Sequence, residues 1–193
     1  LISNIVNKNG WSADLSYNYH LQDSYYGKVK YYANQQVLFG QIRWNKKWSN
    51  HQLLAGIPLR YTYYDDNTPG TATASGVNQP QYSFLPGIFL QDETEVAKNL
   101  VMLAGMRYDY NSTHGSIFTP RLSLKYSSNA GDVFRLSMGN GYRVVNLFTE
   151  DHAALTGARE VIIAEALKPE RSWNCNINYS GIIKHSGGFI NID

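Results

Sequence analysis

The sequence has little cysteine, little charge and no long apolar run, and each absence excludes a class of protein. Cys175 is the single cysteine among 193 residues, so neither an intrachain disulfide nor a cysteine-based metal site can form. Charged residues make up 17% of the chain, 17 basic against 15 acidic, which gives no concentrated basic face for nucleic acid. No window of 18 apolar residues occurs, which excludes a transmembrane helix but not a transmembrane β-barrel.

Residue types with catalytic or cofactor-binding chemistry are present, but without the spacing that this chemistry requires. The 5 histidines are scattered and show no metal-ligand spacing. Gly139-Asn140-Gly141 follows a strand pattern as a dinucleotide-binding loop does, yet Val144 stands where the third glycine belongs. No Ser-His-Asp arrangement and no paired carboxylates point to a hydrolase. We therefore expect neither an enzyme nor a bound cofactor.

The sequence does contain alternation of apolar and polar residues with a period of two, repeated along the chain. Near the start, Trp11, Leu15 and Tyr17 share one face while Asp14 and Asn18 share the other. The alternation predicts an all-β chain with about nine strands, several of them longer than the usual roughly 5–6 residues. The predicted strands are 11–22, 34–48, 51–65, 82–97, 99–110, 119–127, 132–143, 172–181 and 187–193.

The predicted connections alternate between long and short. The longer ones are 23–33, 66–81, 111–118 and 144–171. The short ones are Ser49-Asn50, the break at Lys98, 128–131 and 182–186. This pattern is typical of an outer-membrane barrel, which has long external loops and short periplasmic turns.

Two all-β architectures fit the alternation: a soluble sandwich and an antiparallel up-and-down transmembrane barrel. Strand length favours the barrel, and so do aromatic residues expected at two rims. Trp11, Trp44, Trp48 and Tyr126 fall at one rim, and Tyr61, Tyr63, Tyr108, Tyr110 and Trp173 at the other. An arginine facing lipid at the midplane costs roughly 2–4 kcal/mol, so arginines belong on the lumen face. Six of the eight arginines have the parity of the polar face: Arg43, Arg60, Arg107, Arg121, Arg135 and Arg143.

Two segments resemble TonB-dependent outer-membrane receptors. Residues 88–110 resemble a hairpin in which an apolar-Gln-Asp-Glu strand returns through Gly-x-Arg-Tyr-Asp. Residues 119–179 are similar to a later part of the same barrels. This part carries Pro-Arg at 120–121, Ser-x-Gly-x-Gly-Tyr-Arg at 137–143 and Leu-Lys-Pro-Glu-x-Ser at 167–172. The motifs keep the family's order and strand positions over about half of the chain.

The resemblance implies a barrel of about 22 strands, an N-terminal plug domain and a TonB-contacting box. We expect residues 1–193 to be part of a single such barrel domain, an internal piece in which the plug is not present. The implied function is active uptake of a scarce nutrient (an iron chelate, cobalamin, a metal complex or a glycan) across the outer membrane of a Gram-negative bacterium. Two alternatives remain open, a passive outer-membrane porin and a soluble extracellular carbohydrate-binding sandwich.

The resemblance also implies partners. They are the TonB complex through the missing plug region, the plug domain of the same protein, outer-membrane lipid, and a small-molecule or metal-chelate ligand. Nucleic acid is not expected. Gly139 and Gly141 have the parity of the inward face, where small residues would let the plug approach the wall closely.

Candidate ligand-binding residues lie on the polar face and in the longest predicted loop. Lumen arginines can attract anionic ligands, or they can pair with plug carboxylates and with neighbours such as Asp109. The segment 149–152 offers two carboxylates and an imidazole to a metal complex, or is simply a solvated loop. The predicted ligand-binding residues are Arg107, Asp109, Arg121, Arg143, Glu150, Asp151 and His152.

Overall fold

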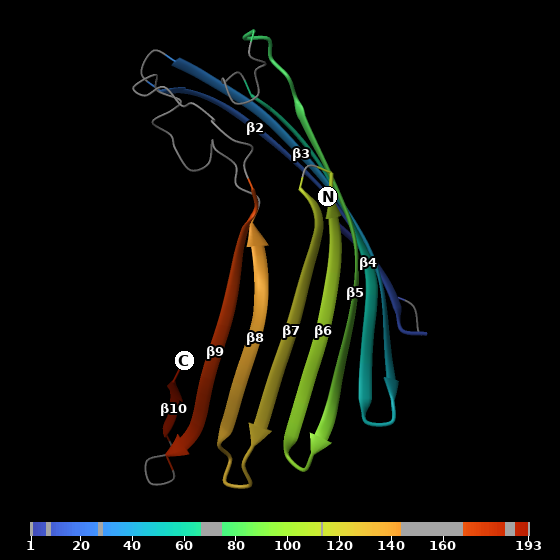
Figure 1. The fold of residues 1–193 in the computed structure, drawn as a ribbon, viewed down its shortest axis with the longest axis vertical. Coiled ribbons are helices and arrows are strands. Elements are labelled where there is room, and N and C mark those ends of the chain that lie inside the picture. The colour runs from blue at the N-terminus through green and yellow to red at the C-terminus, as the bar shows by residue number, and fades with distance from the viewer. Residues whose placement is uncertain are drawn as a thin grey trace.

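The computed structural model of the chain is one curved antiparallel sheet (Figure 1). It describes residues 2–6, 9–26, 29–66, 75–112, 114–143, 168–183 and 188–192. The strands lie in chain order, each hydrogen-bonded to the next. They are β1 (Ile2–Val6), β2 (Trp11–Tyr26), β3 (Val29–Trp48), β4 (His51–Asp66), β5 (Gln81–Ala97), β6 (Leu100–Asn111), β7 (Gly115–Ser127), β8 (Val133–Arg143), β9 (Glu170–Ile183) and β10 (Gly188–Ile192).

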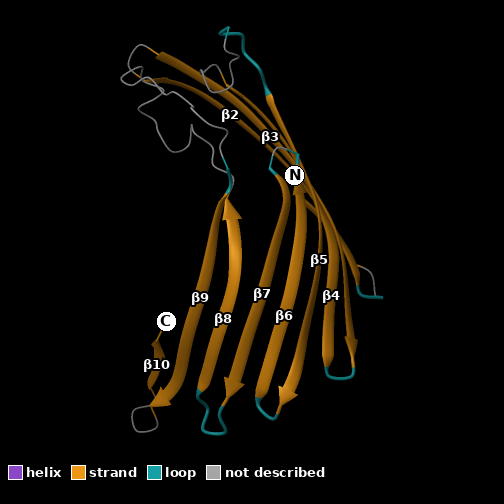
Figure 2. Cartoon of the chain, in the orientation of Figure 1, coloured by secondary structure: helices purple, strands orange, loops and turns teal. Residues whose placement is uncertain are grey.

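The predicted all-β, antiparallel fold is confirmed. Figure 2 shows strands joined by turns, with no helix among the residues that are described. Within that part of the chain, accordingly, no helix has the length and apolar character needed to cross a bilayer. The tight turns at Ser49-Asn50 and Lys98-Asn99 are present, and Ser49 and Asn99 adopt positive φ angles of 55° and 66°.

The main differences from the predicted strands lie in three places. The short strand β1 was missed, and it pairs with β2 from Ile2–Ser16 to Val6–Ser12. The predicted long connection 23–33 is wrong, because β2 and β3 continue through most of it. The predicted loop 111–118 is likewise too long, since β7 begins at Gly115. Asp23 and Lys30 place charged side chains on the apolar face, so the apolar alternation ends there. The backbone pairing of β2 with β3 nevertheless continues past both residues.

The register of the ladder sorts the side chains into two faces. One row of paired residues runs Trp11, Trp44, Ala55, Leu90 and Met106 across β2 to β6. The next row runs Ser12, Arg43, Gly56, Phe89 and Arg107 across the same strands and points to the other face. The apolar face and the arginine-bearing face predicted from parity therefore both persist across neighbouring strands.

Aromatic side chains on the apolar face gather near both ends of the strands. Near the short turns, Trp11 packs on Trp44 with ring centroids 6.4 Å apart. Phe134 similarly lies 6.4 Å from Tyr126 and 4.8 Å from Tyr179. Toward the other end, Tyr82 lies 6.4 Å from Tyr61 and 5.4 Å from Tyr63. Such rows match the interfacial girdles of a membrane barrel.

The sheet has almost no buried core. Among the described residues with apolar side chains, only Tyr31, Ala33, Pro58 and Ile117 are buried. The accessible surface is 13634 Å², whereas a compact protein of 21.8 kDa exposes roughly 9,000 Å². No second sheet covers the apolar face in the part of the chain that is described. The soluble sandwich alternative therefore finds no support in the fold.

If the apolar face, which we call the convex face, meets lipid, a charge at its centre should destabilise the protein far more than a charge on the arginine-bearing face, which we call the concave face. In the full-length protein folded into lipid vesicles, we expect Ile88→Arg to cost roughly 2–4 kcal/mol of unfolding free energy. Gln91→Arg, on the same strand but on the concave face, serves as the control and should cost less than about 1 kcal/mol. Denaturant titration measures both values, and equal costs would contradict a lipid-facing convex surface.

Candidate functional site

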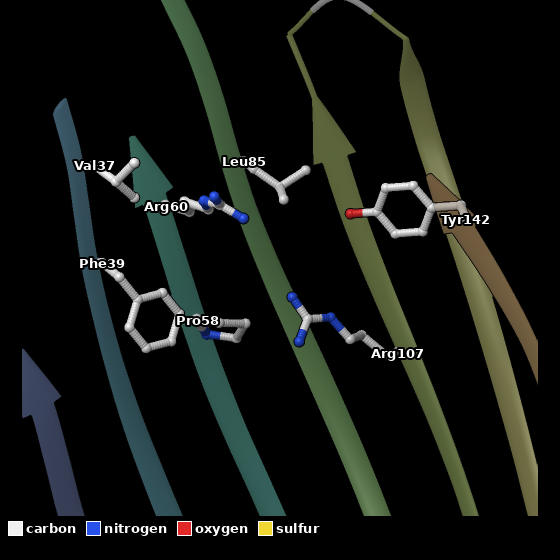
Figure 3. Close-up of a pocket in the computed structure, with 7 residues that line it drawn as sticks. All are labelled: Val37, Phe39, Pro58, Arg60, Leu85, Arg107 and Tyr142. Carbon is white, nitrogen blue, oxygen red and sulfur yellow. The ribbon is translucent and has the colours of Figure 1, made fainter. Parts of the chain in front are cut away.

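A cavity of about 330 Å³ lies on the arginine-bearing face (Figure 3). Its lining comes from β3, β4, β5, β6 and β8, so it lies inside the curve of the sheet. The lining residues are Val37, Phe39, Pro58, Arg60, Leu85, Arg107 and Tyr142. Aliphatic and aromatic walls with two guanidinium groups and one phenol make a site suited to an anionic group on an organic ligand or protein segment.

The Arg107–Asp109 pair fixes one wall of this cavity. Arg107 Nε donates to Asp109 Oδ2 at 2.7 Å and Arg107 Nη2 to Oδ1 at 2.8 Å, so the contact is bidentate. The Asp109 side chain is fully buried, while that of Arg107 is 40% exposed. Pairing with Asp109, one of the alternatives left open for the lumen arginines, is therefore present at Arg107, and the pair is a fixed part of the wall.

Gly87 makes room for the Asp109 carboxylate. The two residues are cross-strand partners on β5 and β6. A Cβ placed at Gly87 would overlap Asp109 Oδ1 and would approach Pro58 Cγ to 3.2 Å. The carboxylate therefore lies over bare backbone, and this position explains how a charged side chain is buried within a single-layered sheet.

The other concave arginines differ in their partners. Arg43 is bound to Asp14 at 2.7 Å, and Arg135 donates to Asn178 at 3.0 Å. Arg60 and Arg121 form no hydrogen bond or ion pair with any residue in the described ranges. In Figure 3 the Arg60 guanidinium points across the cavity toward Arg107. Among the concave arginines of the described ranges, Arg60 and Arg121 are thus available to an acidic partner.

Tyr142 lines the cavity although strand alternation would place it with Leu136 and Met138 on the apolar face. The pairing of β7 with β8 ends at Arg121–Gly139. The next residue of β7, Pro120, has no backbone N–H to donate. Asn140 Nδ2 instead donates to the Phe118 carbonyl at 3.3 Å. We attribute the inward position of Tyr142, whose hydroxyl points into the cavity in Figure 3, to this interruption of the ladder.

Two further predicted site residues, Arg121 and Arg143, do not line the cavity. Arg121 pairs across the sheet with Gly105 and Gly139 and is exposed. Arg143 is bound to Glu170 of β9 at 3.3 Å, with both side chains more than half exposed. Glu150, Asp151 and His152 lie outside the described residues.

Sequence reasoning also missed a cluster at the end of the concave face opposite the short turns. The hydroxyls of Tyr31 and Tyr64 lie 3.0 Å apart, and Ala33 and Asp66 are buried beside them. Tyr64 lies just beyond the tyrosines Tyr61, Tyr63 and Tyr82, on the side away from the short turns. Burial, and then the hydrogen bond with Tyr31, raise the pKa of Tyr64, so its hydroxyl stays protonated. Part of this cluster fell within the wrongly predicted loop 23–33. No group of three metal-ligating side chains occurs in the described ranges.

Comparison with known proteins identifies the family. Residues 3–193 match the family model described as TonB dependent receptor-like, beta-barrel. The chain belongs to this family, and the resemblance inferred from its motifs is confirmed. No curated protein sequence matches the chain.

Solved structures with the same fold are siderophore receptors. The siderophore receptor PirA from Pseudomonas aeruginosa matches with a TM-score of 0.67 at 14% identity, over 93% of this chain and 34% of that chain. A mutant of the ferric enterobactin receptor PfeA from Pseudomonas aeruginosa gives 0.70 at 13% identity, over 97% and 32%. PirA from Acinetobacter baumannii gives 0.56 at 13%, over 94% and 36%. The likeness concerns the fold, and the chain spans about a third of each of these proteins.

The space above Gly87 yields a prediction with an internal control. Gly87→Ala should destabilise the full-length protein by roughly 1–3 kcal/mol, because the added methyl group displaces the Asp109 carboxylate from its fork with Arg107. Gly105→Ala is the control, because its Cβ would meet only ordinary contacts of 3.5 Å. Denaturant midpoints compare the two variants. Similar midpoints for the two variants would show that burial of the Asp109 carboxylate does not require a glycine at position 87.

Proposed function

We propose that this chain is a section of the barrel wall of an outer-membrane receptor that takes up a scarce nutrient with energy supplied through TonB. The observation that carries the proposal is a single sheet with an apolar, aromatic-flanked convex face and an arginine-bearing concave face, in a chain of the TonB-dependent receptor family. The family and the structural neighbours are transport receptors, not enzymes. Membership implies the outer membrane of a Gram-negative bacterium.

We further propose that residues 1–193 belong to one larger barrel domain. Within the described sheet, β1 and β10 each pair on one side only. A bilayer offers no hydrogen-bonding partner to the free edges, so a spanning sheet must be closed by further strands. The concave face would then contact the plug domain of the same protein, through which the TonB complex acts, and the convex face would contact lipid.

We propose an iron chelate as the ligand class. Two neighbours are named siderophore receptors and one a ferric enterobactin receptor, which supports this choice. Arg60 and Arg121 present charged N–H groups that can donate hydrogen bonds to a carboxylate or phenolate oxygen. Of the residues predicted to bind ligand, Arg107 and Asp109 would shape the wall and Arg121 would offer an unpaired charge. Arg143, Glu150, Asp151 and His152 would contribute near the outer mouth.

Deletion of the gene should abolish growth on at least one ferric chelate supplied as the sole iron source, and the full-length gene should restore it. Uptake of radiolabelled chelate should stop when the proton gradient is dissipated, because a TonB-coupled receptor depends on that gradient. Uptake that continues unchanged after dissipation would indicate a passive porin and would contradict the proposal.

The unpaired arginines allow the ligand proposal to be tested at single residues. Arg60→Gln and Arg121→Gln in the full-length receptor should each weaken binding of an anionic ferric chelate at least tenfold, because a charge-assisted hydrogen bond contributes roughly 1.5–3 kcal/mol. Arg135→Gln, whose side chain is bound to Asn178, is the control and should leave the dissociation constant unchanged. Equal dissociation constants for all three variants would contradict ligand binding by Arg60 and Arg121 and would favour contact of these arginines with the plug.

A further inference from the structure

The convex face has a groove of about 560 Å³ that the proposed function does not use. Almost all of its lining is apolar, and it extends from β2 to β7. We refer to it as the outer groove, and its lining residues are Trp11, Ile42, Trp44, Ala55, Gly56, Ile57, Ile88, Phe89, Leu90, Met106, Tyr108 and Phe118. A water-filled groove of this composition would be unfavourable, because apolar surface is stabilised when it is removed from water.

A small residue within a row of large ones accounts for the hollow. Ala55 is paired with Trp44 on one side and with Leu90 on the other, and the row continues to Met106. Ile57 and Ile88 stand in the next row toward the outer end, and both are more than half exposed. The single methyl group of Ala55 therefore leaves a slot between bulky neighbours, which is open to the surroundings of the sheet.

A cation lies at one end of the slot. Lys46 follows Trp44 on the same face of β3, on the side of the short Ser49-Asn50 turn. Its Nζ lies 6.0 Å from the centroid of the Trp44 ring. Lys46 is exposed, and no ion pair joins it to a carboxylate in the described ranges. A positive charge at the edge of an apolar slot, beside two tryptophans, has the charge pattern complementary to an anionic lipid.

We propose that the outer groove binds one phospholipid of the periplasmic leaflet, with an acyl chain in the slot over Ala55 and an anionic headgroup at Lys46. Trp11 and Trp44 would lie at the level of the glycerol ester groups, where indole rings are favoured. The inference rests on the proposed function, since it needs the convex face to meet a bilayer and the short turns to face the periplasm.

The test uses the full-length receptor, purified in a mild detergent with added dioleoyl phosphatidylglycerol or dioleoyl phosphatidylcholine and examined by native mass spectrometry. We expect the wild-type protein to retain one phosphatidylglycerol molecule in preference to phosphatidylcholine. Ala55→Trp, which fills the slot, should reduce the retained lipid at least fivefold. Lys46→Gln should abolish the preference for phosphatidylglycerol while phosphatidylcholine retention stays unchanged.

Matched variants separate the groove from general effects on the barrel. Cys175→Trp adds the same ring to the apolar face of β9, away from the groove, and should retain lipid as the wild type does. Heat-modifiable gel migration verifies that each variant is folded, and Ala55→Leu provides a smaller filling side chain. Equal retention by the Ala55→Trp and Cys175→Trp variants, or no preference in the wild type, would overturn the inference. Ferric-chelate uptake by the same variants should stay at the wild-type rate, so loss of lipid is distinguishable from failure of the transport proposal.

Discussion

The register of the antiparallel ladder is the constraint on which both faces and both hollows of the molecule depend. It aligns Arg43, Gly56, Phe89 and Arg107 in one row across β3 to β6. A slip of one residue between two strands would turn every side chain of one strand to the opposite face, and the arginines would then meet lipid. Since neither face packs against a second layer within the described part of the chain, the ladder itself, and not a core, specifies the structure of this sheet.

Within this register, small residues decide where the wall is hollow and where it is covered. Phe89 lies over Gly56, where an added Cβ would overlap its ring, and Asp109 lies over Gly87 in the same manner. On the opposite face, Ala55 creates the slot among tryptophan, leucine and isoleucine neighbours. The shapes of the concave cavity and the outer groove thus depend on glycine and alanine positions as much as on the large side chains that line them.

The sequence predicted those properties that a strand carries by itself. Period-two alternation is local, so it located most strands and the concave arginines Arg43, Arg60, Arg107, Arg121 and Arg135. It did not reveal properties that depend on a neighbouring strand. The burial of Asp109 requires Gly87 on β5, and the inward position of Tyr142 requires Pro120 on β7. The outer ends of β2 and β3 were missed because the ladder persists there without apolar alternation. The strand β1 was missed because its five residues, ISNIV, do not alternate between apolar and polar.

The proline at position 120 makes the stiffness of the wall uneven. Toward the short turns, β7 and β8 are joined residue by residue from Arg121–Gly139 to Ser127–Val133. On the outer side of Pro120, a side-chain amide replaces the backbone ladder. The outer ends of these two strands can therefore separate without breaking main-chain hydrogen bonds, while their inner ends stay joined. A wall built in this way is joined firmly at the end of the short turns and is free to widen at the opposite end.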